Sequence, residues 1–231
     1  MGLYDRDYAS TTNSYEQEAA RSGTGVVAFV KDTYKLFAAS MMAGAAGAYV
    51  GIPFAAQIHA NSLVLFVIEI ALLFGLFAVK RKAGINLVVM FAFTFMTGIT
   101  LAPLLSMAMV VNPAAIGNAF AMTAVVFGAM SLFAIKTTKD FTSYTKPLMI
   151  ALIVVIVFSL LNAFLFHNPM MGVLISGAVV MLFSILVVYD TQNIIRGGYD
   201  HPIDGAIALY LDFLNIFTAL LQLILAFGND D

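Results

Sequence analysis

Cysteine is absent from this sequence, and charged residues are scarce. Without cysteine the chain cannot form disulfides, thiolate metal sites or a cysteine nucleophile. Asp, Glu, Lys and Arg together make up 10% of the residues, whereas soluble domains average about 25%. The 11 basic residues are balanced by 13 acidic ones, so no basic surplus is left to bind the phosphates of a nucleic acid. The composition therefore excludes an ordinary soluble domain and argues against a nucleic-acid-binding protein.

Long hydrophobic runs occupy most of the chain, and hydrophobic residues make up 61% of the total. Seven runs are long enough to cross a bilayer, which takes about 20 residues of helix. In lipid every backbone N–H and C=O needs a partner within the protein, and the runs lack the strict alternation of barrel strands, so we expect helices. The expected spans are Leu36–Ala56, Leu63–Val79, Ile85–Met109, Ala114–Ile135, Pro147–Phe166, Met170–Val188 and Ala206–Phe227.

The sequence therefore predicts an all-α integral membrane protein with seven transmembrane helices. Residues 1–30 are rich in Ser, Thr, Tyr, Glu and Gly and are expected to form a mobile polar tail. Residues 31–231 are expected to form a single seven-helix membrane domain. The last run is less uniform than the others, and it either crosses the membrane or folds back.

The basic residues predict which side of the membrane each loop faces. All 11 lie before the first span or in the loops that follow the second, fourth and sixth spans. The loops around Ala60, Asn112 and Asn168 contain no Lys or Arg. Because cytoplasmic loops carry the excess of basic residues in membrane proteins, the N-terminus is predicted to be cytoplasmic.

Glycines recur at close spacing in the first span. Gly47 and Gly51 form a GxxxG pattern, and Gly44 precedes them by about one turn. Small residues at this spacing let two membrane helices approach closely. We interpret the pattern as close packing of this helix against another helix of the same chain.

Three acidic residues lie inside the hydrophobic runs or at their ends: Glu69, Asp190 and Asp212. A carboxylate at the centre of a span costs about 3 kcal/mol on insertion scales. Each of the three therefore needs a partner, a proton or water. Because intramembrane ionisable groups mark functional sites by default, these three residues are the candidate site.

The two aspartates stand in the same local pattern. Asp190 and Asp212 each begin a D-x-x-N-I motif, which Asn193 and Asn215 complete. Residues three apart share one face of a helix, and the last span continues its polar face to Gln222. Such a face should turn toward the bundle interior. A short loop joins the two segments, so we expect the two carboxyl groups to meet near the cytoplasmic mouth of the bundle.

Two carboxyl groups that meet in a medium of low dielectric constant cannot both ionise cheaply. Such a pair can share a proton and exchange it near physiological pH. Carboxylate oxygens are also the ligands that hard cations such as Ca²⁺ prefer. The pair is therefore predicted to be a proton-sensitive latch, a cation site or both. The plainer interpretation is that the aspartates only lock two helices together through hydrogen bonds.

The segments around these aspartates resemble a family signature. Tyr189–Gly198 and Ala208–Phe217 resemble the signature of the Bax inhibitor-1 family, and Phe93–Gly98 with Leu101–Pro103 is similar to its third-helix region. The resemblance extends over about residues 30–228. It implies a fold in which six helices surround a central C-terminal seventh, and a pH-sensitive Ca²⁺ leak across the membrane. The lack of cysteine and the short tail are similar to bacterial members, which implies the bacterial inner membrane.

The resemblance also implies roles for single residues. Asp190 and Asp212 match the family's pH sensor and cation site. Glu69 matches an acidic residue associated with the cation route, and Lys80 or Arg81 matches a basic position that pairs with the aspartates in some members. No cofactor is implied, and Ca²⁺ is the ion transported or bound. Bacterial relatives also include modulators of a membrane-anchored protease, so a regulator of a membrane protease or of another membrane complex is the alternative function.

Enzyme motifs are weak or missing. Tyr189 and Asp190 with Asp212 are similar to the aspartates of an intramembrane protease, but that class has a glycine before its second aspartate, where this chain has Leu211. Neither a G-x-S-x-G elbow nor an H-E-x-x-H metal motif occurs. We therefore expect a membrane protein that is not an enzyme. Its expected partners are lipid, Ca²⁺, protons and, in the alternative, another membrane protein.

Overall fold

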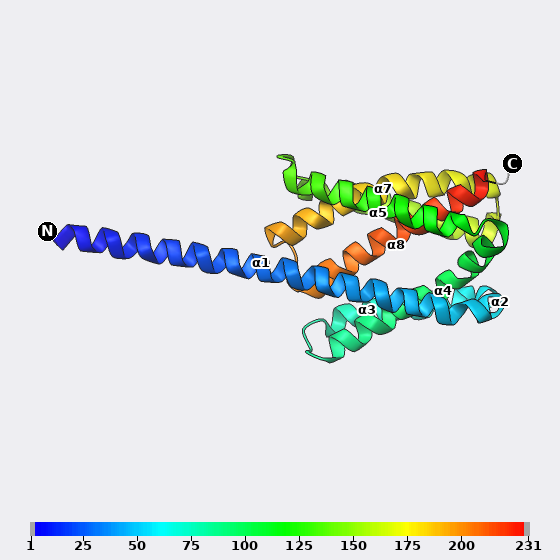
Figure 1. Ribbon diagram of the computed structural model, residues 1–231, viewed down its shortest axis with the longest axis horizontal. Helices are drawn as coiled ribbons and strands as arrows, with labels where there is room; N and C mark the ends of the chain where they lie inside the picture. Colours follow the sequence, from blue (N-terminus) through cyan, green and yellow to red (C-terminus); the bar gives the residue numbers. More distant parts are fainter. Residues whose placement is uncertain (1–2, 229–231) are drawn as a thin grey trace.

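A computed structural model describes the backbone of residues 3–228 and the side chains of residues 25–228. Within this part of the chain all regular structure is helical (Figure 1). Short 3₁₀ turns cover Ile52–Phe54 and Thr142–Tyr144, and a π-helical turn covers Asn162–Phe166. The α-helices are α1 (Leu3–Gly51), α2 (Ala55–Ala60), α3 (Ser62–Val79), α4 (Ile85–Val111), α5 (Ala114–Lys136), α6 (Thr145–Leu161), α7 (Pro169–Arg196) and α8 (Pro202–Phe227).

Seven helical segments are long and apolar enough to cross a membrane, which confirms the predicted all-α membrane protein. The first combines the second half of α1 with the 3₁₀ turn and α2, and it runs over Gly25–Ala60. The last expected span is covered by α8. A helix of its 26 residues is about 39 Å long at 1.5 Å per residue, which exceeds the hydrocarbon thickness of about 30 Å.

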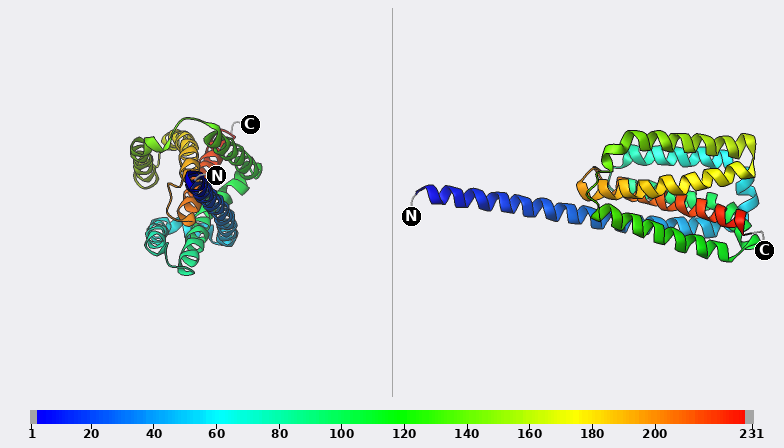
Figure 2. Two further views of the ribbon diagram at one scale, coloured as in Figure 1. Left: turned by 90° about the vertical axis from the view of Figure 1, so that its left-hand side faces the viewer. Right: turned by 90° about the horizontal axis from the view of Figure 1, so that it is seen from above.

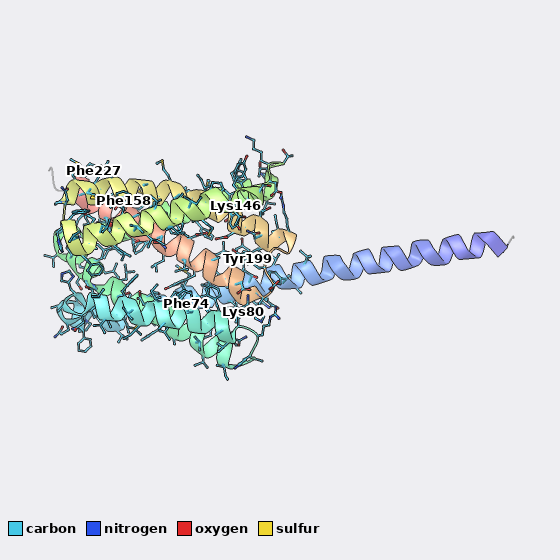
Figure 3. All side chains as sticks on the ribbon, turned by 180° about the vertical axis from the view of Figure 1, so that it is seen from behind. Phe74, Lys80, Lys146, Phe158, Tyr199 and Phe227 are labelled. Carbon is cyan, nitrogen blue, oxygen red and sulfur yellow. The ribbon has the colours of Figure 1, made fainter. Side chains whose placement is uncertain are left out.

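The two ends of the bundle differ in charge. Lys80 and Lys146 lie at the end from which α1 extends, whereas Phe158 and Phe227 lie at the opposite end (Figure 3). Because α8 runs along the bundle to that opposite end (Figures 1 and 2), it does not fold back. This arrangement fits an odd number of crossings and the segregation of basic loops seen in the sequence.

The helix α1 begins at Leu3 and therefore continues through the polar segment that precedes the first span. Its first half projects well beyond the bundle (Figure 2). The mobility of residues 1–30 and the single domain over residues 31–231 stay predictions.

The most buried span is α8. In its most hydrophobic stretch 56% of the residues are buried, compared with 6% to 33% in the other six spans. It packs mainly against α1, α5 and α7, with a smaller contact with α4. By contrast, α3 and α6 expose most of their apolar side chains, as lipid-facing helices do. The arrangement of six helices around a central seventh stays a prediction.

The glycines of the first span pack α1 tightly against α4, which confirms close packing within the chain. A Cβ atom on Gly98 would lie 1.9 Å from the carbonyl oxygen of Gly44, and one on Gly47 would lie 1.9 Å from that of Phe95. Side chains larger than hydrogen therefore cannot occupy these positions without separating the two helices.

The loop between α7 and α8 positions the two signature segments. Gly197 ends α7 in the left-handed conformation, with φ of 73°, as glycine does at helix ends. His201 then caps α8 by accepting a hydrogen bond from the backbone N–H of Ile203, and Pro202 occupies the first helical position. This tight turn lets α8 pack back along α7, so polar residues near the start of α8 reach those near the end of α7.

Candidate functional site

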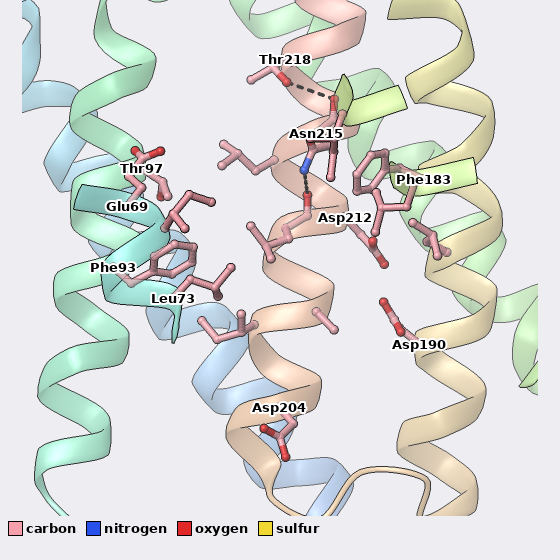
Figure 4. Close-up of a pocket in the computed structure, with 18 of the residues that line it drawn as sticks. Glu69, Leu73, Phe93, Thr97, Phe183, Asp190, Asp204, Asp212, Asn215 and Thr218 are labelled. Atoms are coloured by element: carbon pink, nitrogen blue, oxygen red, sulfur yellow. Dashed lines mark hydrogen bonds between the residues drawn. The ribbon is translucent and has the colours of Figure 1, made fainter. Parts of the chain in front are cut away.

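A cavity of about 1050 Å³ lies between α3, α4, α6, α7 and α8. Most of its wall is apolar, and Figure 4 shows that the polar residues reach it from opposite sides. All three acidic residues singled out in the sequence line this cavity. Its polar and charged lining residues are Glu69, Lys80, Thr97, Thr100, Tyr189, Asp190, Tyr199, Asp200, Asp204, Asp212, Asn215, Thr218 and Gln222.

The structure brings Asp190 of α7 and Asp212 of α8 together, and we call these two residues the aspartate pair. Their carboxyl groups point toward one another across the contact between the two helices (Figure 4). Both are buried, with 7% of Asp190 and 2% of Asp212 exposed. The pair therefore consists of two acidic groups removed from water, whose charges interact directly.

Tyr199, in the loop between α7 and α8, binds one member of the pair. Its hydroxyl donates a hydrogen bond of 2.6 Å to Oδ1 of Asp190. Burial and the neighbouring carboxylate of Asp190 raise the pKa of Tyr199 far above its ordinary value, so the phenol keeps its proton and remains a donor. The Oδ2 atom of Asp212, in contrast, is buried without a hydrogen-bond partner among the described residues.

The amides on the same helical faces do not bind the pair. Asn193 and Asn215 each donate to the backbone carbonyl four residues earlier in their own helix, at 3.1 and 2.8 Å. Gln222 accepts a hydrogen bond of 2.7 Å from Ser176 and so joins α8 to α7. Asn215 and Gln222 line the cavity. Asn193 carries the backbone turn that ends α7, which makes it a structural residue.

The basic residues after α3 bind other acids than the aspartate pair. Lys80 Nζ lies 2.8 Å from Oδ2 of Asp204, and Arg81 Nη2 lies 3.5 Å from Oδ2 of Asp200. Neither basic side chain has a described contact with the aspartate pair. The reason is their position: α3 ends beside the start of α8, where Asp204 lies about two helical turns before Asp212.

Glu69 lies on the side of the cavity formed by α3 and accepts a hydrogen bond from the hydroxyl of Thr100 on α4. A second cavity of about 450 Å³, lined by residues of α2, α3 and α4 and by Phe164, also has Glu69 and Thr100 in its wall. Glu69 is therefore a carboxyl group shared by two cavities, one of which contains the aspartate pair.

In the described part of the chain, no group of three or more His, Asp or Glu side chains is placed to bind a metal ion. A cation at the aspartate pair would be bound by the oxygens of two carboxyl groups. Oxygen ligands suit Ca²⁺, and Oδ2 of Asp212 has no hydrogen-bond partner among the described residues.

A buried glutamine of the signature, which the sequence did not identify, holds the loop between α5 and α6. Gln192 donates to the carbonyl of Lys139 at 2.9 Å and accepts from the backbone N–H of Phe141 at 2.8 Å. Asp140, between those two, binds Arg196 at 2.7 Å. These contacts hold the end of α7, and with it Asp190, against a neighbouring loop.

Comparisons with known proteins agree with the signature. The family model described as "Inhibitor of apoptosis-promoting Bax1" matches residues 26–229. An uncharacterised protein of Campylobacter jejuni is 48% identical over 99% of this chain and 100% of its own, and one of Helicobacter pylori is 47% identical over the full length of both. The inner membrane protein YbhL of Escherichia coli is 33% identical over 71% of this chain and 73% of its own. This integral membrane protein belongs to the Bax inhibitor-1 family.

Proposed function

We propose that this protein is a pH-sensitive leak for cations, with Ca²⁺ as the ion that passes, and that protonation of the aspartate pair closes it. The observation that supports this function best is the placement of two buried, facing carboxyl groups on the wall of a cavity of about 1050 Å³.

The charge of the pair supplies the mechanism. With one shared proton, a hydrogen bond between carboxyl and carboxylate holds α7 against α8 and keeps the bundle tight. Loss of that proton leaves two negative charges, which repel one another strongly at low dielectric constant. The same two charges attract a cation. The leak should therefore increase as the pH rises.

Glu69 provides the next carboxylate along the route. It lies across the cavity from the aspartate pair (Figure 4) and also borders the second cavity. Conduction needs several sites that bind an ion well enough to admit it and weakly enough to release it. The pair and Glu69, which are separate and have few ligands each, meet that requirement.

The proposal includes an orientation. Basic residues gather at the end of the bundle from which α1 extends, and this end is the cytoplasmic one by the positive-inside rule. The mouth beside Lys80 then opens toward the cytoplasm. Because the similar Escherichia coli protein is named an inner membrane protein, we place this protein in the bacterial inner membrane.

The test is Ca²⁺ flux into liposomes that contain the purified protein, measured from pH 6 to pH 8. The flux should rise with pH by up to about tenfold per unit, which is the limit for one proton. Asp212→Asn removes the charge repulsion and should abolish most of this pH dependence. Asp32→Asn, a change at an exposed carboxylate of α1 that does not line the cavity, is the matched control and should keep it. If Asp212→Asn leaves both the flux and its pH dependence unchanged, the pair is not the sensor.

A regulator that binds a membrane protease or another membrane complex is the second candidate. The projection of α1 beyond the bundle favours it, because a protruding helix offers a docking segment (Figure 2). Deletion of residues 2–25 separates the two functions. A regulator loses its effect on the partner while flux in liposomes persists, whereas a pure leak shows no change in either measurement.

A further inference from the structure

The mouth of the cavity contains a buried carboxylate that the proposed mechanism does not use. Asp204 lies in the first turn of α8, is 8% exposed, and lines the cavity at a different level from the aspartate pair (Figure 4). Its Oδ2 accepts a hydrogen bond of 2.8 Å from Lys80. Its Oδ1 is buried and has no hydrogen-bond partner in the part of the chain that the structure describes. An acceptor left in this state carries an unrecovered desolvation cost, and an incoming cation would remove that cost.

Lys80 is the only basic side chain in the lining of this cavity, as far as the described residues extend. It comes from the end of α3, whereas Asp204 belongs to α8, so the ion pair joins two helices on opposite sides of the mouth. The lysine side chain remains one quarter exposed. Its ammonium group is a compact charge on a flexible stem and can therefore leave the carboxylate for solvent without any movement of the backbone.

We propose that Asp204 is a site for a divalent cation at the mouth of the cavity, and that the ammonium group of Lys80 occupies this site until the cation displaces it. The inference rests on the proposed leak function. It adds a third cation site to the route, besides the aspartate pair and Glu69, and a tethered ammonium group that competes for this site.

The chemistry of the two competitors supports this assignment. A carboxylate can bind a hard divalent cation through both oxygens, whereas the lysine engages only one of them. Because the ammonium group is attached to the chain through the Lys80 side chain, it has a high effective concentration at Asp204. It therefore occupies the site when other cations are dilute. A site with one carboxylate and a competing ammonium group binds a cation weakly. Weak binding suits a conduction route, because the ion must be released again.

The chain contains a matched pair for comparison. Arg81 and Asp200 join the same two regions, but their side chains are 77% and 72% exposed and their atoms are 3.5 Å apart. Water competes with every contact of such an exposed ion pair, so removal of the Arg81–Asp200 pair should change cation binding little. Arg81→Gln is therefore the control for Lys80→Gln: each removes one positive charge at the mouth, but only Lys80→Gln frees a buried carboxylate.

The experiment measures Tb³⁺ binding to the purified full-length protein, through luminescence that tyrosine sensitises. The chain has no tryptophan, and Tyr199 lies on the cavity wall, so an ion bound in the cavity gives a signal, and the dependence of that signal on Asp204 assigns it to this site. Lys80→Gln should bind Tb³⁺ about five- to tenfold more tightly, the size of an ordinary coupling between two competing ligands. Arg81→Gln should stay within about twofold of the unchanged protein. The double variant Lys80→Gln with Asp204→Asn should lose the gain.

Two outcomes would overturn the proposal: Lys80→Gln binds Tb³⁺ no more tightly than the unchanged protein, or the double variant keeps the gain. Lys80→Met, which preserves most of the length of the side chain, is the second variant if Lys80→Gln does not yield a monodisperse protein, and the same result is expected of it. The binding measurement needs no flux. If Tb³⁺ binding tightens in an Asp204-dependent way but the protein shows no pH-dependent flux, the leak proposal is overturned and the Asp204 site stands. If the flux depends on pH but Tb³⁺ binding does not tighten, only the Asp204 site is overturned.

Discussion

Tyr199 makes the two members of the aspartate pair unequal. Asp190 accepts a hydrogen bond from the phenol, while Asp212 has an oxygen without a partner among the described residues. A hydrogen bond to the charged form of a carboxyl group stabilises that form. When the pair holds one proton, the negative charge should therefore lie on Asp190 and the proton on Asp212. In the proposed leak, Asp212 is then the group that loses its proton on opening.

Replacing Tyr199 with phenylalanine tests this role. The hydrogen bond of a charged group contributes about 1.5 to 3 kcal/mol, and about 1.4 kcal/mol corresponds to one pH unit. Without it, the first negative charge of the pair is harder to form, so the pH at which the pair loses its first proton, followed by the carboxyl band in infrared difference spectra, should move about one unit or more toward higher pH. Tyr189→Phe is the control, because the Tyr189 hydroxyl bonds Thr145 instead. A midpoint of this proton loss that stays in place, or moves to lower pH, would show that Tyr199 does not stabilise the charge.

At the scale of helices, the contact between α1 and α4 depends on an absence of side chains. Gly98 of α4 lies against the backbone at Gly44 of α1, and Gly47 of α1 lies against the backbone at Phe95. Helices in a membrane gain little from hydrophobic burial against each other, so their association depends on close van der Waals packing. The contact also bears on the site, because α4 carries Thr100, the partner of Glu69.

Gly98→Ala should therefore destabilise the protein, since the added methyl group would lie 1.9 Å from a backbone oxygen that cannot turn away. Overpacking of this kind costs about 1 to 3 kcal/mol, which should appear as a lower midpoint of thermal unfolding in detergent. Gly117→Ala in α5 is the control, because nothing lies within 4 Å of its added Cβ. That change should be neutral or stabilise the helix by up to about 1 kcal/mol. Equal midpoints for the two variants would contradict the packing argument.

At the scale of the whole molecule, the bundle separates charge along its length. Lys80 and Lys146 lie at one end with the projecting part of α1, and α8 ends at the other (Figure 3). The Lys80–Asp204 ion pair and the loop held by Gln192 both lie at the basic end of the bundle. The proposed regulation by protons and the proposed cation site at Asp204 are therefore both near one face of the membrane.

The absence of cysteine makes this orientation directly testable. Ser143, in the loop before α6, and Ser62, at the start of α3, are both exposed and belong to opposite ends of the bundle. With a membrane-impermeant maleimide, Ser143→Cys should be labelled only in inverted membrane vesicles, and Ser62→Cys only in spheroplasts. The parent protein, which has no thiol, should remain unlabelled in both. The opposite pattern would place the N-terminus outside the cytoplasm.

The seven spans could be read from the sequence because lipid permits few alternatives. A long apolar run must form a helix when no water is present to bind its backbone groups, so each expected span coincides with an observed helical segment for most of its length. The first segment starts at Gly25, before the expected Leu36. The end of α7 differs: the helix continues through the polar signature to Arg196, beyond the expected Val188. Hydropathy detects only the apolar part of a helix, whereas Gln192 and the loop that it binds cover the polar part.

The two acidic residues in similar patterns on α7 and α8 could likewise be identified from the sequence, because a carboxylate in an apolar run is costly and marks a functional site by default. Their surroundings were decided by the tertiary structure. Tyr199 reaches Asp190 only through the turn at Gly197, and Lys80 reaches Asp204 across more than a hundred residues of chain. Local spacing along one helix predicts which side chains share a face. The pairing of side chains from different helices depends on which helices meet and at what height, and only the folded bundle determines that.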